Sequence, residues 1–445
     1  MAPRAAVRAR RRPHSGDKVI RNCGADGVGA IHAAVTQATI RQCAVLAGGL
    51  GTRLGVLTAT TPKPLLPCGD RPFLAWLLRE LVRFGVEDVL LLTGHLSARV
   101  EAAVADLAAA VPLPVRIGVS VEPSPAGTGG ALWHARERLD ERFLLVNGDS
   151  LLDGNLSRLL AAAADDGSGT VGRLALRAVP DAARYGVAER DGDRITTFRE
   201  RGAPGAPGTI NAGIYLLDRR VLDDIAPVCS LERDVLPRLA ARGALRGTVV
   251  DGWFIDIGIP DDLARAQAEL PARLRRPALF LDRDGVLNQD HGYVGTRDRF
   301  HWTATAKDAI RAATEAGWHV FVVTNQSGVA RGLYDEAAVR DLHAWMADEA
   351  RLAGGTIDDI RYCPFHPEAV LPEYRRDSDW RKPGPGMILD LIRAWDLDSG
   401  TCILVGDQPS DLVAAAAAGV AGHEFHGGDL HALVDGLLRR RHALS

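Results

Sequence analysis

Two acidic side chains, Asp282 and Asp284, follow directly after the apolar run Ala278–Leu281. At the end of a strand, one such carboxylate can attack as a nucleophile while the other serves as general acid and base. An Asp-x-Asp-Gly sequence also occurs in calcium loops, but no run of further oxygen ligands follows this one. The pair therefore predicts covalent catalysis rather than a calcium site.

Three further polar blocks follow the pair, each beside an apolar strand: Val323–Gly328, Arg381–Gly386 and Val405–Asp411. Together with Asp282–Asn288, and in this order, they resemble the four motifs of the haloacid dehalogenase superfamily. The subfamily they resemble contains the heptose-bisphosphate and histidinol-phosphate phosphatases. The resemblance spans roughly Pro277 to the C-terminus and implies a HAD-like phosphatase with a minimal cap.

The resemblance also implies a role for each polar residue. Asp282 attacks phosphorus to give an aspartyl-phosphate, and Asp284 protonates the leaving alcohol and then activates water. The residues implied to hold Mg²⁺ are Asp282, Asp407 and the backbone carbonyl of Asp284. Thr324 and Asn325 are implied to bind phosphoryl oxygens, and Lys382 is implied to neutralise the developing charge. Arg381 is implied to select the substrate, and Asp411 to orient Lys382 or the metal shell.

One loop departs from the pattern of these phosphatases, which usually carry four zinc ligands there. Cys363 is present, but Phe365 stands at the usual histidine position, and Ser378 and Trp380 stand at the paired cysteines. A structural zinc site needs four nitrogen or sulfur ligands. We expect no zinc, packing by Phe365 and Trp380 in its place, and no special role for His366.

The first half of the chain opens on a glycine-rich loop, Gly48–Gly51, after the apolar run Cys43–Ala47. Glycines there let backbone N–H groups approach a phosphate, and Arg53 and Lys63 can neutralise its charge. Taken alone, such a loop fits an ordinary tight turn equally well.

Five later blocks strengthen the phosphate interpretation: 122–130, 146–149, 198–201, 211–213 and 253–258. In this order the set resembles the sugar-1-phosphate nucleotidyltransferases over roughly Cys43 to Glu269. Within them it is most similar to the heptose-1-phosphate guanylyltransferases and their mannose-1-phosphate relatives. Arg201 departs from the lysine that the family often carries after the glutamate, which changes the geometry of a phosphate contact.

That resemblance implies attack of a sugar phosphate on the α-phosphate of GTP or another nucleoside triphosphate, with loss of pyrophosphate. Asp149 and Asp256 would hold Mg²⁺, and Arg53 and Lys63 would stabilise the triphosphate. The residues implied to face the nucleotide are Gly48, Gly49, Gly127, Thr128 and Gly129, and those implied to read sugar hydroxyls are Glu200 and Asn211.

The elements that must position these residues alternate between short apolar strands and amphipathic helices. We expect strands at Cys43–Ala47, Val89–Thr93, Phe143–Val146, Ile214–Leu217, Val249–Val250, Ala278–Leu281, Val320–Val323 and Cys402–Val405, and a helix at Phe73–Phe84. The alanine runs 161–164 and 414–418 read as helix. Alternation predicts an α/β fold with two Rossmann-like, doubly wound, largely parallel sheets. The resemblance to the nucleotidyltransferases implies that the first of them is GT-A-like.

The predicted domains are a transferase at 41–270, a linker at 271–277 and a phosphatase at 278–445. We expect residues 1–40 to form a basic, disordered tail, or to result from a wrongly chosen start codon. A targeting peptide and a phosphate-binding arm are the less favoured interpretations.

The overall composition limits the class of partner. A net charge of −3 gives no reason to expect a nucleic acid or a membrane surface, and no apolar run is long enough to span a bilayer. The six cysteines are scattered, which favours a reducing, cytoplasmic compartment. The sequence leaves the oligomeric state open.

Since both halves handle phosphorylated sugars, we expect consecutive steps: a heptose 1,7-bisphosphate loses its 7-phosphate, and the heptose 1-phosphate becomes a GDP-sugar. The alternative is a mannose-1-phosphate guanylyltransferase fused to a phosphatase of other specificity, such as one for histidinol phosphate. A binding protein without turnover, or a phosphatase half that is only a structural appendage, is disfavoured by the intact charged residues.

Overall fold

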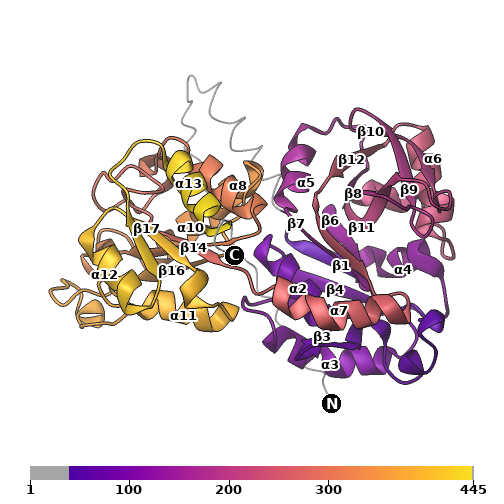
Figure 1. Cartoon of the computed structure of the whole chain (residues 1–445), viewed down its shortest axis with the longest axis horizontal. Helices are drawn as coiled ribbons and strands as arrows, with labels where there is room; N and C mark the ends of the chain where they lie inside the picture. Colours follow the sequence, from indigo (N-terminus) through magenta and orange to yellow (C-terminus); the bar gives the residue numbers. More distant parts are fainter. Residues whose placement is uncertain (1–39, 443–445) are drawn as a thin grey trace, which may run out of the picture. The chain divides into compact units, whose positions relative to one another are not determined.

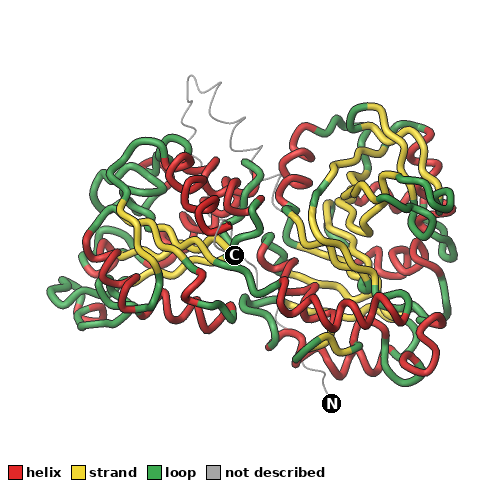
Figure 2. The backbone as a smooth tube through the Cα atoms, viewed as in Figure 1, coloured by secondary structure: helices red, strands yellow, loops and turns green. Residues whose placement is uncertain are grey.

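The computed structural model describes residues 40–442 and their side chains up to Arg441 (Figure 1). The predicted basic tail, apart from Ile40, lies outside the described residues. Two separate sheets carry the two predicted sites, one in each half of the chain (Figure 2).

The first sheet has nine strands. Their order is β5 (Arg116–Val121), β4 (Asp88–Thr93), β1 (Gln42–Leu46), β6 (Arg142–Asn147), β11 (Gly208–Asp218), β8 (Gly172–Val179), β12 (Leu245–Val249), β10 (Arg194–Arg199) and β9 (Val187–Asp191). The strands expected at Cys43–Ala47, Val89–Thr93, Phe143–Val146 and Ile214–Leu217 are present, and Val249 ends β12.

The prediction of a largely parallel first sheet is wrong for its second half. Strands β5, β4, β1 and β6 are parallel, but β11 runs antiparallel to β6 and β8, and β9 and β10 form an antiparallel pair. Gly192 and Asp193 connect this pair, with Gly192 at φ 60°. A two-residue Gly-Asp connection between strands is a hairpin signal in a sequence, and it accounts for the antiparallel pairing here.

Helices and two small ribbons complete the first half. The helices are α2 (Phe73–Arg83), α3 (Ser97–Ala109), α4 (Gly127–Ala135), α5 (Ser157–Ala162), α6 (Leu236–Ala241) and α7 (Pro260–Arg273). The ribbons pair β2 (Pro67–Cys68) with β3 (Arg71–Pro72), and β7 (Ser150–Gly154) with β13 (Gly252–Asp256). Helix α7 contains the first residues of the expected linker, so the predicted 271–277 segment begins inside a helix.

The second sheet has five parallel strands, in the order β16 (Asp359–Cys363), β15 (His319–Asn325), β14 (Ala278–Leu281), β17 (Ile403–Gly406) and β18 (Ala421–Glu424). The expected strands at 278–281, 320–323 and 402–405 correspond to β14, β15 and β17. The chain leaves β14 toward β15 and β16 and returns on the other side through β17 and β18. The resulting switch point at the carboxyl end of β14 is where open α/β sheets bind ligands.

Helices cover both faces of this sheet (Figure 1). They are α8 (Ala306–Glu315), α9 (Ser327–Ala330), α10 (Glu336–Leu352), α11 (Gly386–Trp395), α12 (Pro409–Ala417) and α13 (Leu430–His442). Leu279 and Leu281 of β14 pack in one apolar cluster with α8, α10 and α13, while Ala278 and Phe280 pack in another with α11 and α12. A strand buried on both faces reads as a continuous apolar run, which is why β14 was recognisable.

The described residues contain no helix long and apolar enough to cross a membrane. The five cysteines among them are free.

Candidate active sites

In the first half, a cavity of about 320 Å³ opens at the carboxyl ends of β1 and β6. Its lining includes the predicted residues Gly48, Gly49, Lys63, Gly127, Thr128 and Asp149. A Cβ on Gly48 would lie 3.0 Å from the backbone nitrogen of Gly94, a tight contact that glycine avoids. The loop backbone thus lies close against its neighbour and faces the cavity, as a phosphate-binding loop requires.

Lys63 lies between the two predicted metal-binding carboxylates. Its Nζ is 2.5 Å from Oδ2 of Asp149 and 3.7 Å from Oδ1 of Asp256, and the lysine is 8% exposed. The ribbon β7–β13 brings the carboxylates together, because Asp256 pairs with Ser150, the neighbour of Asp149. Burial raises the pKa of Asp256, and the charge of Asp149 raises it further. A cation therefore stabilises this pair.

Sequence reasoning did not assign roles to three polar residues that line the cavity: Glu122, Asn147 and Glu232. Glu232 accepts a hydrogen bond from Thr128 Oγ1 at 2.7 Å, and Thr128 Oγ1 accepts one from the backbone N–H of Leu231. Burial raises the pKa of Glu122. Glu122 begins the sequence block 122–130, whereas Glu232 belongs to a distant segment that contains no motif.

The cavity lining does not include five predicted residues: Asp256, which contacts Lys63 as described above, and Arg53, Gly129, Glu200 and Asn211. Arg53 and Glu200 are exposed. The backbone N–H of Gly129 donates to the carbonyl of Cys229, and Asn211 donates to the Tyr215 hydroxyl at 2.6 Å. Their proposed contacts with nucleotide and sugar stay predictions.

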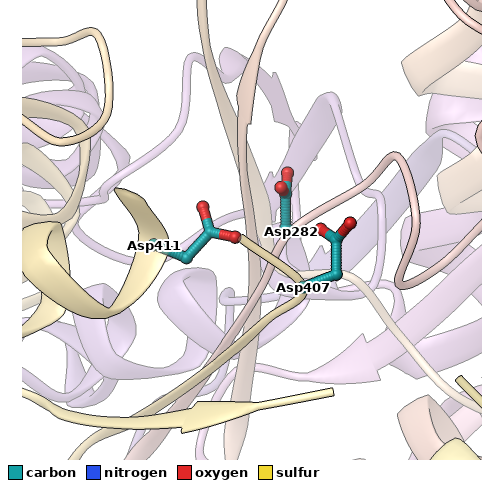
Figure 3. Close-up of side chains that lie close together, drawn as sticks. All are labelled: Asp282, Asp407 and Asp411. Atoms are coloured by element: carbon teal, nitrogen blue, oxygen red, sulfur yellow. The ribbon is translucent and has the colours of Figure 1, made fainter. Parts of the chain in front are cut away.

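In the second half, Asp282, Asp407 and Asp411 lie side by side (Figure 3). One carboxylate oxygen from each lies within 4.8 Å of the others. Asp282 follows β14, Asp407 follows β17, and Asp411 lies in the first turn of α12. Gly285, at φ 87°, passes so close that a Cβ would lie 2.4 Å from Oδ2 of Asp407. The predicted pair at Asp282 and Asp407 is thus brought together, with Asp411 added.

Lys382 contacts both this group of carboxylates and the backbone of β15. Its Nζ lies 2.8 Å from Asp282 and 2.6 Å from Asp411, and it donates to the carbonyl of Val323 at 3.0 Å. Burial raises the pKa of Asp282 to about 7, although the charge of Lys382 acts to lower it. Burial acts to lower the pKa of Lys382, but the charges of Asp282 and Asp411 and their hydrogen bonds outweigh it, so the pKa is raised. The contact of Asp411 with Lys382 agrees with the orienting role predicted for it.

Three further predicted phosphatase residues lie at the end of β15 or next to Lys382 in the sequence: Thr324, Asn325 and Arg381. Thr324 is buried, and its hydroxyl accepts a hydrogen bond from Gln326, which also donates to Asp284. The Asn325 side chain exchanges two hydrogen bonds with the backbone of Lys382, at 3.0 and 3.1 Å, so it fixes that segment as well. Arg381 is half-buried, and its Nη1 has no hydrogen-bond partner among the described residues.

The loop that departs from the zinc pattern is packed with aromatic rings. Phe365 lies against Tyr374, with ring centroids 6.1 Å apart. The Arg376 guanidinium lies over the Phe365 ring, 3.5 Å from its centroid. Phe365 and Trp380 both pack against the apolar cluster that contains Cys363. This packing agrees with the expected substitution; the absence of zinc stays a prediction.

The two halves, each with a lysine between carboxylates at the edge of an α/β sheet, define a transferase and a phosphatase in one chain. Residues 43–273, more than half of the chain, match the family described as nucleotidyl transferase. The chain belongs to this family. Residues 379–424 match the family described as HAD-hydrolase-like.

Curated relatives match the chain over about a third of its length. A D-glycero-beta-D-manno-heptose-1,7-bisphosphate 7-phosphatase of Rhodopseudomonas palustris is 51% identical over 164 residues, covering 37% of this chain and 91% of the relative. The chain belongs to the family of this phosphatase too. A D-glycero-alpha-D-manno-heptose-1,7-bisphosphate 7-phosphatase of Burkholderia mallei is 43% identical over 33% of this chain and 78% of its own length.

Among solved structures, HddC from Yersinia pseudotuberculosis is 28% identical, covering 52% of this chain and all of that one, with a TM-score of 0.46. A HAD-like phosphatase of Mesorhizobium loti is 32% identical over 37% of this chain and 88% of its own, with a TM-score of 0.34.

Proposed function

We propose that the chain performs two consecutive steps of nucleotide-sugar biosynthesis. The phosphatase half removes the 7-phosphate of a heptose 1,7-bisphosphate. The transferase half then joins the resulting heptose 1-phosphate to GMP from GTP, giving GDP-heptose and pyrophosphate. The observation that carries this proposal is the pairing of a complete Asp–Lys–Asp centre in each half with phosphatase relatives that act on a heptose bisphosphate.

In the transferase step, an oxygen of the sugar phosphate attacks the α-phosphorus and the bond to pyrophosphate breaks. Little covalent work falls to the protein, so positioning and charge neutralisation dominate. The glycine loop supplies backbone donors, and Lys63 supplies a positive charge beside the cavity. Guanine presents two adjacent N–H donors on one edge, and Glu122 and Glu232 offer acceptor-only carboxylates in the same cavity. These carboxylates support GTP as the nucleotide.

In the phosphatase step, Asp282 forms a bond to phosphorus as the ester bond breaks, and Asp284 gives its proton to the leaving alcohol. Asp284 then takes a proton from the water that attacks the aspartyl-phosphate, which releases phosphate and restores Asp282. Lys382, 2.8 Å from Asp282, neutralises charge on the transferred group. Arg381, with a free Nη1, would contact the rest of the substrate.

Both centres fit Mg²⁺. Oδ1 of Asp407 is buried without a hydrogen-bond partner in the described part of the chain, beside two further carboxylates, and hard oxygen ligands suit this ion. Asp282, Asp407 and the Asp284 carbonyl would hold it in one half, and Asp149 and Asp256 in the other. When bound, Mg²⁺ neutralises phosphate charge and so lets an anionic nucleophile approach an anionic phosphate.

Substrate profiling of the full chain tests the proposal. Phosphate release is measured from the α and β anomers of heptose 1,7-bisphosphate and from histidinol phosphate, and pyrophosphate release from GTP, ATP and UTP with heptose 1-phosphate or mannose 1-phosphate. The proposal predicts preference for a heptose bisphosphate and for GTP with heptose 1-phosphate. Preference for mannose 1-phosphate, without release from either bisphosphate, would support the mannose alternative. The relatives include phosphatases named for each anomer, so the same panel decides the anomer.

A further inference from the structure

The Asp284 carboxylate is surrounded by N–H donors. Arg283, which is fully buried, donates to both oxygens at 2.8 and 2.9 Å, and Asn288 donates to Oδ1 at 3.0 Å. Gln326 donates to Oδ2 at 2.9 Å. Asp284 itself is 22% exposed. Because N–H groups donate to both oxygens, these hydrogen bonds fix the orientation of the Asp284 carboxylate.

The amide of Gln326 is itself held at both ends. The side chain is 1% exposed, and its Nε2 donates to Thr324 Oγ1 at 2.9 Å as well as to Asp284. Its Oε1 accepts a hydrogen bond from the Tyr334 hydroxyl at 2.9 Å. A hydroxyl donor at this end decides which way the amide faces: oxygen toward Tyr334 and NH₂ toward Asp284.

Two glycines make room for Tyr334. A Cβ on Gly295 would lie 2.2 Å from its ring, and a Cβ on Gly328 would lie 2.4 Å from its hydroxyl oxygen. Burial raises the pKa of Tyr334 to about 12, so the hydroxyl keeps its proton and remains a donor. The ring comes from the segment between α9 and α10, outside the four sequence blocks.

We propose that Gln326 and Tyr334 are positioning residues for the phosphatase reaction: Tyr334 fixes the amide of Gln326, and this amide aims the carboxyl group of Asp284. The inference rests on the proposed phosphatase function and deepens it. Neither residue exchanges a proton with the substrate. Without the Tyr334 hydroxyl, the amide can turn its oxygen toward Asp284, and the two oxygens then repel each other.

The test uses full-length Gln326→Leu, Tyr334→Phe and the double variant. Tyr374→Phe is the matched control, because its hydroxyl donates to Glu336 and not to the Asp284 network. The readouts are kcat and KM for heptose 1,7-bisphosphate, the burst of p-nitrophenol from p-nitrophenyl phosphate, and the thermal unfolding midpoint. The burst reports transfer to Asp282 with a leaving group that needs little protonation.

We expect Gln326→Leu to lower kcat for the sugar phosphate about 100-fold, as small misplacements of a catalytic group do, with little change in KM. Tyr334→Phe should lower kcat about 10-fold, and should have no further effect once Gln326 is Leu, because it acts through the amide. The burst rate should fall less than kcat for the sugar phosphate. The control should retain wild-type kinetics.

Independent, additive losses in the double variant would overturn the relay from Tyr334 to Gln326. A wild-type kcat in Tyr334→Phe, or a change in KM alone, would overturn the positioning role. If Gln326→Leu does not fold, the kinetics of Tyr334→Phe decide the question. If the wild-type chain hydrolyses neither ester, the proposed function itself fails, and that result is distinct from equal activity of wild type and variants.

Discussion

At the scale of single residues, the same arrangement occurs twice. Lys63 lies between Asp149 and Asp256, and Lys382 lies between Asp282 and Asp411. Each lysine side chain is almost fully buried, and each contacts two carboxylates. A buried charge is tolerated when it is paired, so removing one partner leaves an uncompensated charge. Both centres therefore hold charged groups ready beside the place where phosphate would bind.

Glu122 gives the first prediction. Changing Glu122→Gln replaces one acceptor oxygen with an NH₂ donor. Under the proposed function a guanine N–H would then lose its partner, and the site would discriminate less. We expect KM for GTP to rise at least about 10-fold, with KM for the sugar phosphate little changed. Steady-state kinetics with each substrate varied would check this. An unchanged preference for GTP over ATP would contradict the role of Glu122.

Lys382 gives the second prediction. Changing Lys382→Met removes the cation beside Asp282 and should lower phosphatase kcat by at least about 100-fold. The thermal unfolding midpoint should fall too, because Asp282 and Asp411 lose their buried partner. Lys307→Met, which removes a less buried ion pair with Glu349, is the control and should keep full phosphatase activity.

How much of each site could be predicted depended on distance along the chain. Strand-end motifs located Asp149, Asp256, Asp282 and Asp407, because a strand fixes where the next residues point. Glu232 could not be found, since its contact with Thr128 joins segments about a hundred residues apart. Tyr334 could not be found for the same reason. Nothing in its local sequence shows that Gly295 and Gly328 leave space for its ring, so that its hydroxyl reaches Gln326.

At the scale of elements, β14, β15 and β17 were predictable because strands buried on both faces are continuous apolar runs. The mixed order of the first sheet was not. Strand direction depends on pairings between distant segments such as β11 and β8, which periodicity does not encode.

Strand β15 gives the third prediction, on stability. Burial lowers the pKa of His319 to about 4, below its ordinary value of 6.5. Between these values the unfolded chain binds a proton that the folded chain does not, so stability falls as pH decreases from about 6.5 to 4. The urea midpoint measured across this range should fall, and His319→Phe should flatten the decline. An equally steep decline of the urea midpoint in His319→Phe would contradict this role of His319. Burial also lowers the pKa of His343, so we expect the variant to retain part of the decline.

The loop from Cys363 to Trp380 gives the fourth prediction. Phe365, Tyr374 and Arg376 pack together in the loop that departs from the zinc pattern, so we expect purified protein to contain far less than one zinc per chain. Elemental analysis checks this. EDTA should abolish both activities, and Mg²⁺ alone should restore them; restoration that requires zinc would contradict the interpretation.

At the scale of the whole molecule, the two centres use separate sheets and no residue in common. Asp282→Asn should therefore abolish phosphate release while leaving nucleotidyl transfer to heptose 1-phosphate within about twofold of wild type. Asp149→Ala should do the reverse. Loss of both activities from either single change, in a protein that still unfolds at the wild-type temperature, would contradict independent centres.

The central claim is that the two activities act in sequence, and one measurement tests it most directly. The full chain is incubated with Mg²⁺, GTP and heptose 1,7-bisphosphate while phosphate, pyrophosphate and nucleotide sugar are followed together. The account predicts GDP-heptose, its disappearance in Asp282→Asn, and its return when heptose 1-phosphate is added to that variant. Release of no phosphate from the bisphosphate, together with formation of GDP-mannose from mannose 1-phosphate, would contradict the account.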